Sequence, residues 1–236
     1  MQYLALLGSD PSREPEPGTP EFAARSEGYV RFGERAAQSL RGGAALEEPA
    51  TAATIRHGDG APLVTDGPFA ETTEVIGGFY VFETDTLDDA IELARQIPSA
   101  GTGWVSLRPL AGWWPYDHER IGQRFLAMAY GKEGASDTPG TPEWEAAGEK
   151  HMAFVAGAGD GVLAGAALHP TTMATTVQVR DGEVIVTDGS LGEAADVAAC
   201  IYLLQAADRD AAVELARGVP TGPESAAEVR PVWERS

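Results

Sequence analysis

The sequence predicts an α+β fold that occurs twice in one chain of 236 residues. The duplication is visible because the segment GTPEF at 18–22 recurs as GTPEW at 140–144, an offset of 140 − 18 = 122. The same offset carries VTDG at 64–67 onto 186–189. Short apolar runs typical of strands alternate with helix-start signals in each copy, and this mixture indicates the α+β class.

The repeat predicts two modules, residues 1–111 and 123–236, joined by an aromatic linker over 112–122. Glycine and proline in the linker break regular structure. Trp113, Trp114 and Tyr116 argue against a freely solvated tether, so we expect the linker to pack against the modules.

Each module is expected to have the order β-α-β-β-β-α-β, which is a ferredoxin-like plan with one added strand. Thr19 before Pro20 is a helix start, and Gly42-Gly43 is interpreted as the end of that helix. A hairpin is expected over 50–56 and 62–65, and in the second copy it has an Asp181-Gly182 turn. The remaining elements are strands at 2–7, 75–83 and 104–108 and a helix capped by Thr86 and Asp89.

Composition narrows the possible partners. The net charge is −19, with 36 acidic and 17 basic side chains and no lysine/arginine cluster, so nucleic acid and anionic membranes are not expected partners. The apolar run at 1–7 is far too short to span a membrane. A single cysteine, Cys200, is typical of a reducing compartment, which predicts a cytoplasmic protein.

Three segments of the first copy carry a resemblance to a known family: TAATIR at 51–56, VTDGPFAET at 64–72 and GGFY at 77–80. These resemble the YCII-related, DGPF-containing proteins. The second copy is similar more weakly, because its loop has become DGSLGE at 188–193.

The resemblance implies a dimeric α/β barrel in which two ferredoxin-like modules face each other across their sheets. Single-module relatives pair as homodimers, so here the pair is expected within one chain, giving a monomer with an internal pseudo-dimer or a homodimer. The family is largely without an established reaction. Related members use a histidine and an aspartate in a cleft, and one member of the wider group removes chloride from a chlorinated hydroquinone.

The histidine of the first helix of the family corresponds to His151, whereas the first copy has Tyr29 at the equivalent position. An imidazole transfers protons near pH 7, and a carboxylate such as Asp188 would orient it. His151 and Asp188 are therefore the candidate catalytic residues. The alternative is a structural histidine with a satisfied hydrogen bond.

The loop Asp66, Gly67, Pro68 and Phe69 is the candidate ligand-binding segment, together with Tyr29. In this interpretation the loop carries Phe69 to a pocket rim and Asp66 accepts a hydrogen bond or a proton. The alternative is that these residue types only terminate a strand. The histidine is missing from the first copy and the proline and phenylalanine from the second, which predicts one surviving site or two unlike sites.

No pair of histidines and no Cys/His cluster has metal-ligand spacing, and the glycine-rich segments lack a phosphate-binding pattern, so neither a metal nor a cofactor is expected. The sequence leaves open whether the chain is an enzyme. One hypothesis is a cofactor-free enzyme that uses His/Asp proton transfer on a small aromatic or enolisable metabolite. The others are a non-catalytic small-molecule-binding or regulatory module, as expected of a family often encoded beside alternative sigma factors, and a scaffold with no ligand.

Overall fold

A computed structural model describes residues 1–58, 61–69, 75–112, 122–132, 138–189, 197–222 and 225–233. The chain divides into two compact units. Unit 1 consists of Met1–Ala45, Thr72–Pro109 and Thr171–Gly192, and unit 2 of Leu46–Glu71, Leu110–Pro170 and Glu193–Ser236. Each unit therefore contains parts of both sequence repeats.

Unit 1 contains a sheet with the strand order β10-β9-β6-β1-β5-β2, in which all neighbouring strands are antiparallel. Its strands are β1 (Gln2–Ser9), β2 (Leu40–Ala45), β5 (Val75–Glu83), β6 (Trp104–Pro109), β9 (Thr175–Arg180) and β10 (Glu183–Asp188). Its helices are α1 (Pro20–Ala36), α2 (Leu87–Ala94) and α3 (Pro98–Thr102).

Unit 2 contains the corresponding antiparallel sheet, ordered β4-β3-β12-β7-β11-β8. Its strands are β3 (Ala53–Arg56), β4 (Leu63–Asp66), β7 (Gln123–Gly131), β8 (Val162–Ala167), β11 (Val197–Ala206) and β12 (Ala226–Pro231). Its helices are α4 (Pro142–Ala158) and α5 (Arg209–Ala216). Single 3-10 turns lie at Pro11–Arg13 and Thr171–Met173 in unit 1 and at Pro49–Thr51 and Gly159–Gly161 in unit 2.

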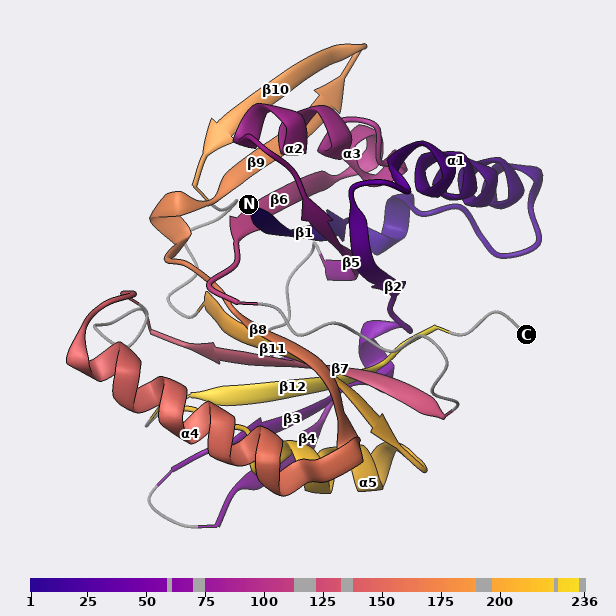
Figure 1. Ribbon diagram of the computed structural model, residues 1–236. Helices are drawn as coiled ribbons and strands as arrows, with labels where there is room; N and C mark the ends of the chain where they lie inside the picture. The colour runs from indigo at the N-terminus through magenta and orange to yellow at the C-terminus, as the bar shows by residue number, and fades with distance from the viewer. Residues whose placement is uncertain are drawn as a thin grey trace. The chain divides into compact units, whose positions relative to one another are not determined.

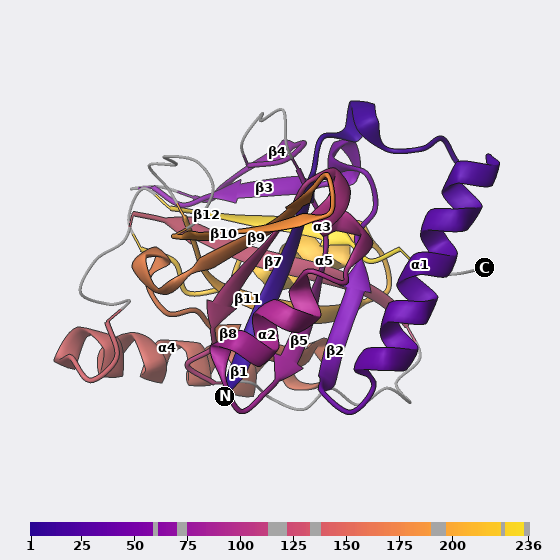
Figure 2. The same cartoon turned by 90° about the horizontal axis from the view of Figure 1, so that it is seen from above.

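The two repeats exchange their β-hairpins. The β3–β4 hairpin belongs to the first repeat, yet β3 pairs with β12 of the second repeat (Figure 1). Reciprocally, the β9–β10 hairpin of the second repeat pairs through β9 with β6 of the first. The colours of Figure 1 show the exchange, because early purple strands lie beside the late yellow strand β12, and Figure 2 shows the same strands from above. Each six-stranded sheet is therefore built from four strands of one repeat and a hairpin of the other.

The helices begin where their capping residues predict. Thr19 and Thr141 accept hydrogen bonds from the backbone amides of Phe22 and Trp144, and Pro20 and Pro142 follow them at the first helical position. Thr86 forms the predicted capping box with Asp89 at the start of α2.

One expectation about a helix end is wrong. Gly42 and Gly43 do not end α1, which stops at Ala36, but lie within β2. A Cβ atom on Gly43 would lie 2.4 Å from the ring of Tyr80 on the neighbouring strand β5. Gly43 is explained by the close approach of a tyrosine ring on the neighbouring strand rather than by a helix stop.

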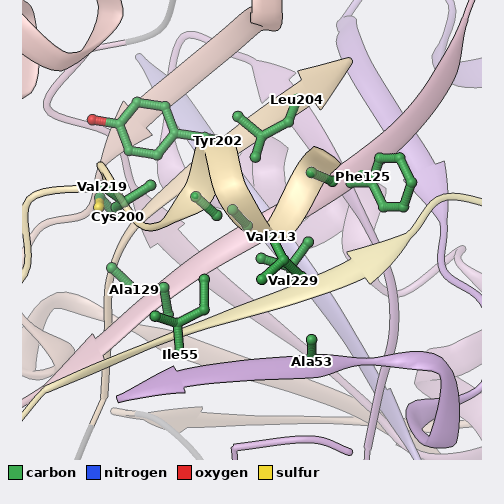
Figure 3. Packing of buried hydrophobic residues seen from close by; sticks show 14 residues of the cluster. Ala53, Ile55, Phe125, Ala129, Cys200, Tyr202, Leu204, Val213, Val219 and Val229 are labelled. Carbon is green, nitrogen blue, oxygen red and sulfur yellow. The ribbon is translucent and has the colours of Figure 1, made fainter. Parts of the chain in front are cut away.

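Each sheet carries its main hydrophobic core on the face that its helices cover. In unit 2 the alternate residues Phe125 and Ala129 of β7 pack with Cys200, Tyr202 and Leu204 of β11 (Figure 3). Val213 and Ala216 of α5 and Ile55 of the exchanged hairpin complete this core, with Phe154 and Val155 of α4 packed against it. The exchanged hairpin therefore contributes to the core of the unit that it joins.

Candidate functional site

A cavity of about 600 Å³ opens in unit 2, a volume in the range of small-molecule sites. Its described walls come from α4, from the ends of β7, β8 and β11, from 111–112 and from 220–222 with Ser225. Among the lining residues, the ones with a polar or aromatic side chain are Tyr130, Lys132, Trp144, Lys150, His151, Tyr202, Thr221 and Ser225.

Helix α4 makes the cavity by changing residue size along one face. Its first half presents Trp144, Ala147, Gly148 and His151 to the cavity, a spacing of three or four residues that keeps side chains on one side of a helix. Its second half presents large side chains, Phe154 and Val155, that pack onto the core. The small residues Ala147 and Gly148 leave the cavity open. Further along the helix, Phe154 and Val155 fill the corresponding space against the core.

His151 and Tyr202 form the polar centre of the cavity. Nδ1 of His151 lies 2.6 Å from the hydroxyl oxygen of Tyr202 on β11, and either atom donates the hydrogen depending on the imidazole tautomer. The ring of Phe154 packs edge-on against Tyr202 at 5.1 Å between centroids. The tyrosine is therefore held by packing, and it fixes the orientation of the histidine.

Burial keeps this pair neutral. Desolvation, with a smaller contribution from the charge of Lys150, lowers the pKa of His151 below its usual value. Desolvation also raises the pKa of the Tyr202 hydroxyl above its usual value. At pH 7 the imidazole is uncharged and the phenol keeps its proton, so the pair offers one hydrogen-bond donor or acceptor to a ligand through Nε2.

The candidate loop 66–69 lies in the same unit as this cavity because its hairpin is exchanged. Gly67 has φ +95°, a conformation that favours glycine, and its amide donates to the carbonyl oxygen of Ala52 at 2.9 Å. Thr54 Oγ1 donates to the carbonyl oxygen of Gly67 at 2.9 Å. Pro68 is half-buried. The turn is thus fixed by hydrogen bonds within its own hairpin.

Phe69 is held against the second repeat. Its ring stacks on Tyr130 with 4.8 Å between centroids and 13° between planes, and Tyr130 lines the cavity. Its backbone amide donates to Glu228 Oε2 at 2.9 Å, and Glu228 pairs with Arg230, both only 3% exposed. Phe69 therefore contacts a residue of the cavity wall, Tyr130, from outside the cavity.

The predicted aspartates are placed differently from the cavity residues. Asp66 is exposed and accepts a hydrogen bond from Arg209 Nη2 at 2.7 Å, a contact that ties β4 to α5 and is not part of the cavity wall. Asp188 is the exposed last residue of β10 and belongs to unit 1, whereas His151 belongs to unit 2. The hydrogen-bond partner found for His151 is Tyr202, and the His151–Asp188 pairing stays a prediction.

Comparison with known proteins identifies the repeat unit. The model of the YCII-related domain matches twice, over residues 1–114 and 124–236. The chain belongs to the YCII-related family. An uncharacterised protein of Rhizobium meliloti (strain 1021) is 37% identical over 120 residues, which are 47% of this chain and 93% of that protein. A protein of about one module's length is thus similar to about half of this duplicated chain.

The hairpin exchange places the two candidate features of the sequence, the loop at 66–69 and His151, in one unit. The intact DGPF loop comes from the first repeat and His151 from the second, and both belong to unit 2. Unit 1 contains Tyr29 together with Asp188 and Gly189, where the second repeat has DGSL in place of DGPF.

The equivalent region of unit 1 is arranged differently. Tyr29, the counterpart of His151, forms a 2.6 Å hydrogen bond between its hydroxyl and Ser99 Oγ. Arg25, the counterpart of Ala147, reaches Thr102 and Glu14 at 2.8 and 2.9 Å. In unit 2 the hydroxyl of Thr221, the counterpart of Ser99, is buried and has no hydrogen-bond partner among the described residues. Replacing Tyr29 and Arg25 by shorter side chains thus leaves both space and an unsatisfied hydroxyl.

Tyr202, Tyr130 and Thr221 were not predicted as site residues. Alternation along β11 places Tyr202 on the helix-covered face, and this could be inferred only once the strand and its neighbouring helix were known. The described residues contain no group of three or more His, Cys, Asp or Glu side chains arranged to hold a metal. Within the described part of the chain, no helix combines the length and apolar character needed to cross a membrane.

Proposed function

We propose that this YCII-related protein binds a small organic molecule in the cavity of unit 2, with His151 as its polar anchor. The observation that carries the proposal is the His151–Tyr202 hydrogen bond in the wall of a cavity of ligand size. The buried, unsatisfied hydroxyl of Thr221 supports it, because buried polar groups ordinarily have partners and a ligand would supply one. The neighbouring loop at 66–69 supports the cavity wall, because the ring of Phe69 stacks on Tyr130.

Filling the cavity tests the proposal. Gly148 faces the cavity on α4, and a Cβ atom there meets no other atom within 4 Å, so Gly148→Phe is expected to occupy the ligand space. Gly157 on the same helix is exposed and equally open, so Gly157→Phe is the matched control. Small molecules extracted from the purified proteins are identified by mass spectrometry. We expect a molecule with the wild type and the control that is lost from Gly148→Phe, and equal extracts from all three would contradict the proposal.

Proton transfer by His151 is a second candidate function, favoured by one observation. The lowered pKa keeps the imidazole neutral at pH 7, and Nδ1 is oriented by Tyr202, so Nε2 is presented in the state that a general base requires. Once the bound molecule is identified, His151→Gln should abolish its turnover but not its binding. Unchanged turnover in this variant would exclude His151 as the group that transfers the proton.

We also propose that the two YCII-related modules form an internal pseudo-dimer of the dimeric α/β barrel type. The reciprocal exchange of hairpins supports this, because each sheet contains two strands of the other repeat. A crystal structure in which the two sheets do not face each other would overturn it.

A further inference from the structure

Each exchanged hairpin is held in the sheet that it joins by side chains as well as by strand pairing. In the β3–β4 hairpin, Asp66 accepts a hydrogen bond from Nη2 of Arg209 on α5 at 2.7 Å. The guanidinium of Arg209 also donates to the carbonyl oxygens of Thr51 and Ala52, at 3.1 and 2.8 Å. One side chain of the second repeat thus holds the start and the end of a hairpin that belongs to the first.

Phe69 adds a second contact between the same hairpin and the second repeat. Its ring stacks on that of Tyr130 on β7, with 4.8 Å between centroids, and the guanidinium of Arg56 lies 5.1 Å from its centre. Its backbone amide donates to Glu228 on β12 at 2.9 Å. Glu228 is only 3% exposed and is paired with Arg230. Ring and backbone of Phe69 are therefore both bound by residues of the second repeat.

The first repeat lacks the side chains that receive this loop. At the offset of 122, the counterparts of the receiving residues Arg209, Tyr130 and Glu228 are, in the same order, Leu87, Gly8 and Ser106. Gly8 lies against the indole ring of Trp104, and a Cβ atom on this glycine would lie 2.0 Å from that ring. The loop at 66–69 would therefore find neither a guanidinium nor a carboxylate at the equivalent positions of a first repeat.

The β9–β10 hairpin is held in the sheet of unit 1 by different contacts. The guanidinium of Arg180 on β9 donates to three carbonyl oxygens at the end of α3, at 3.3, 3.3 and 2.8 Å, those of Ala100, Gly101 and Gly103. Gln178 donates to the last of these carbonyl oxygens at 3.2 Å. The counterpart of Arg180 in the first repeat is Gly58, and residues 220–222, which correspond to the start of α3, are not helical. Each hairpin thus has contacts suited to the opposite repeat.

We infer that these two sets of contacts determine which YCII-related modules pair: a first-repeat hairpin selects the sheet of a second repeat, and a second-repeat hairpin selects the sheet of a first. Strand pairing alone does not choose, because the two sheets have the same strand order. The side chains make the choice, and the covalent linker is not required for it. The inference is independent of ligand binding in unit 2.

Hydrogen exchange of the full-length chain tests the two sets of contacts separately. Phe69→Leu/Arg209→Leu removes the first set, and both substitutions introduce the residue that the other repeat has at the equivalent position. Arg180→Gln removes the second set. We expect roughly tenfold faster exchange of the β3 amides in the double variant and of the β9 amides in Arg180→Gln, each without change in the other hairpin. Arg95→Gln, which removes a cation paired within its own helix, should change neither. Exchange unchanged in both hairpin variants would overturn the inference.

A cut chain tests the choice of partner without the linker. A protease site placed within 112–122 is cleaved after the full-length protein has folded. The two halves are unfolded in urea, refolded together by dilution and weighed by native mass spectrometry. We expect unlike pairs in roughly tenfold excess over like pairs. Phe69→Leu/Arg209→Leu combined with Arg180→Gln should shift the pairs toward a statistical mixture. A statistical mixture from the wild type, the absence of unlike pairs, or an undiminished excess in the combined variant would each overturn the inference.

Discussion

The His151–Tyr202 pair joins an imidazole to a neutral phenol rather than to a carboxylate. A carboxylate stabilises an imidazolium ion, whereas a neutral phenol does not. The burial that lowers the pKa of His151 and raises that of Tyr202 favours the uncharged form of both side chains, and this avoids the cost of burying an unpaired charge. The pair is therefore suited to hold a ligand by hydrogen bonding, and any proton that His151 accepts must be passed on to that ligand or to solvent.

The lowered pKa of His151 makes a prediction about stability and pH. The unfolded chain binds a proton with the ordinary histidine pKa near 6.5, and the folded chain binds it only at lower pH. Between these two values the unfolded state holds more protons, so this residue reduces stability as the pH falls below about 6.5. Urea unfolding at pH 7.5 and pH 5.0 should show a smaller loss of unfolding free energy in His151→Gln than in the wild type. Carboxylates titrate alike in both proteins, and an identical loss would contradict the buried neutral state.

Removing the Tyr202 hydroxyl should affect both stability and binding. Tyr202→Phe leaves Nδ1 of His151 without its partner, and the expected cost is about 1–3 kcal/mol of unfolding free energy. Binding of the molecule that co-purifies with the wild type should weaken, because the imidazole loses its fixed orientation. Tyr29→Phe removes a tyrosine hydroxyl in unit 1, where Tyr29 is the counterpart of His151 and bonds to Ser99, and is the control outside unit 2. It should cost about 1 kcal/mol of stability without altering binding in unit 2, and weakened binding in the control would argue against a site confined to that unit.

At the scale of elements, the turn that follows each exchanged hairpin has the same structure in both repeats. Thr54 and Thr176 each donate to the carbonyl oxygen of the glycine after the hairpin, at 2.9 and 2.8 Å. The two glycines, Gly67 and Gly189, have φ +95° and +89°. Among the described residues, an arginine partner is found for Asp66 but not for Asp188, and Arg209 corresponds to Leu87 in the first repeat.

The conformation of Gly67 gives a matched pair of substitutions. Gly67→Ala forces a side chain into a left-handed conformation and should destabilise the protein by about 1–2 kcal/mol. Gly77→Ala places the same methyl group on exposed, ordinary strand backbone with no atom nearby, and should be neutral or slightly stabilising. Urea unfolding compares the two variants, and equal effects would show that the turn conformation at Gly67 is not required.

The elements themselves were predictable from local signals, whereas their partners were not. The caps at Thr19 and Thr86 and the Asp181-Gly182 turn depend on residues a few positions apart, and the structure confirms them. Strand β2 was missed because the glycine at position 43 accommodates the ring of Tyr80, a residue far along the chain. The pairing of β3 with β12 was not predictable either, since a hairpin that fits one copy of a repeated sheet fits the other almost equally well.

At the candidate site, too, contacts between residues far apart in the sequence could not be predicted. His151 was identified from the resemblance, but its partner Tyr202 lies 51 residues away on another element. The intact loop and the histidine occur in different repeats, which left one site or two as open alternatives. The hairpin exchange places Phe69 and His151 in the same unit, although they are 151 − 69 = 82 positions apart in the sequence.

For the whole molecule, the exchange means that neither repeat contains a complete unit. Residues 123–236 alone would lack strands β3 and β4, so the β12 edge of their sheet would be unpaired. Their own β9–β10 hairpin would lack its partner β6. Unpaired edges and uncovered apolar surface drive association, and two copies of the fragment can satisfy each other by exchanging the same hairpin.

We therefore expect the isolated 123–236 fragment to form a homodimer or to aggregate, while the full-length chain keeps the exchange within itself. Size-exclusion chromatography with light scattering gives the mass of each. Adding the separately expressed 1–111 fragment should convert the fragment into a one-to-one complex, because that fragment supplies β3–β4 and accepts β9–β10. A folded, monodisperse monomer of 123–236 would contradict the prediction, since it would require β12 to be stable as an open edge and the β9–β10 hairpin to be stable without β6.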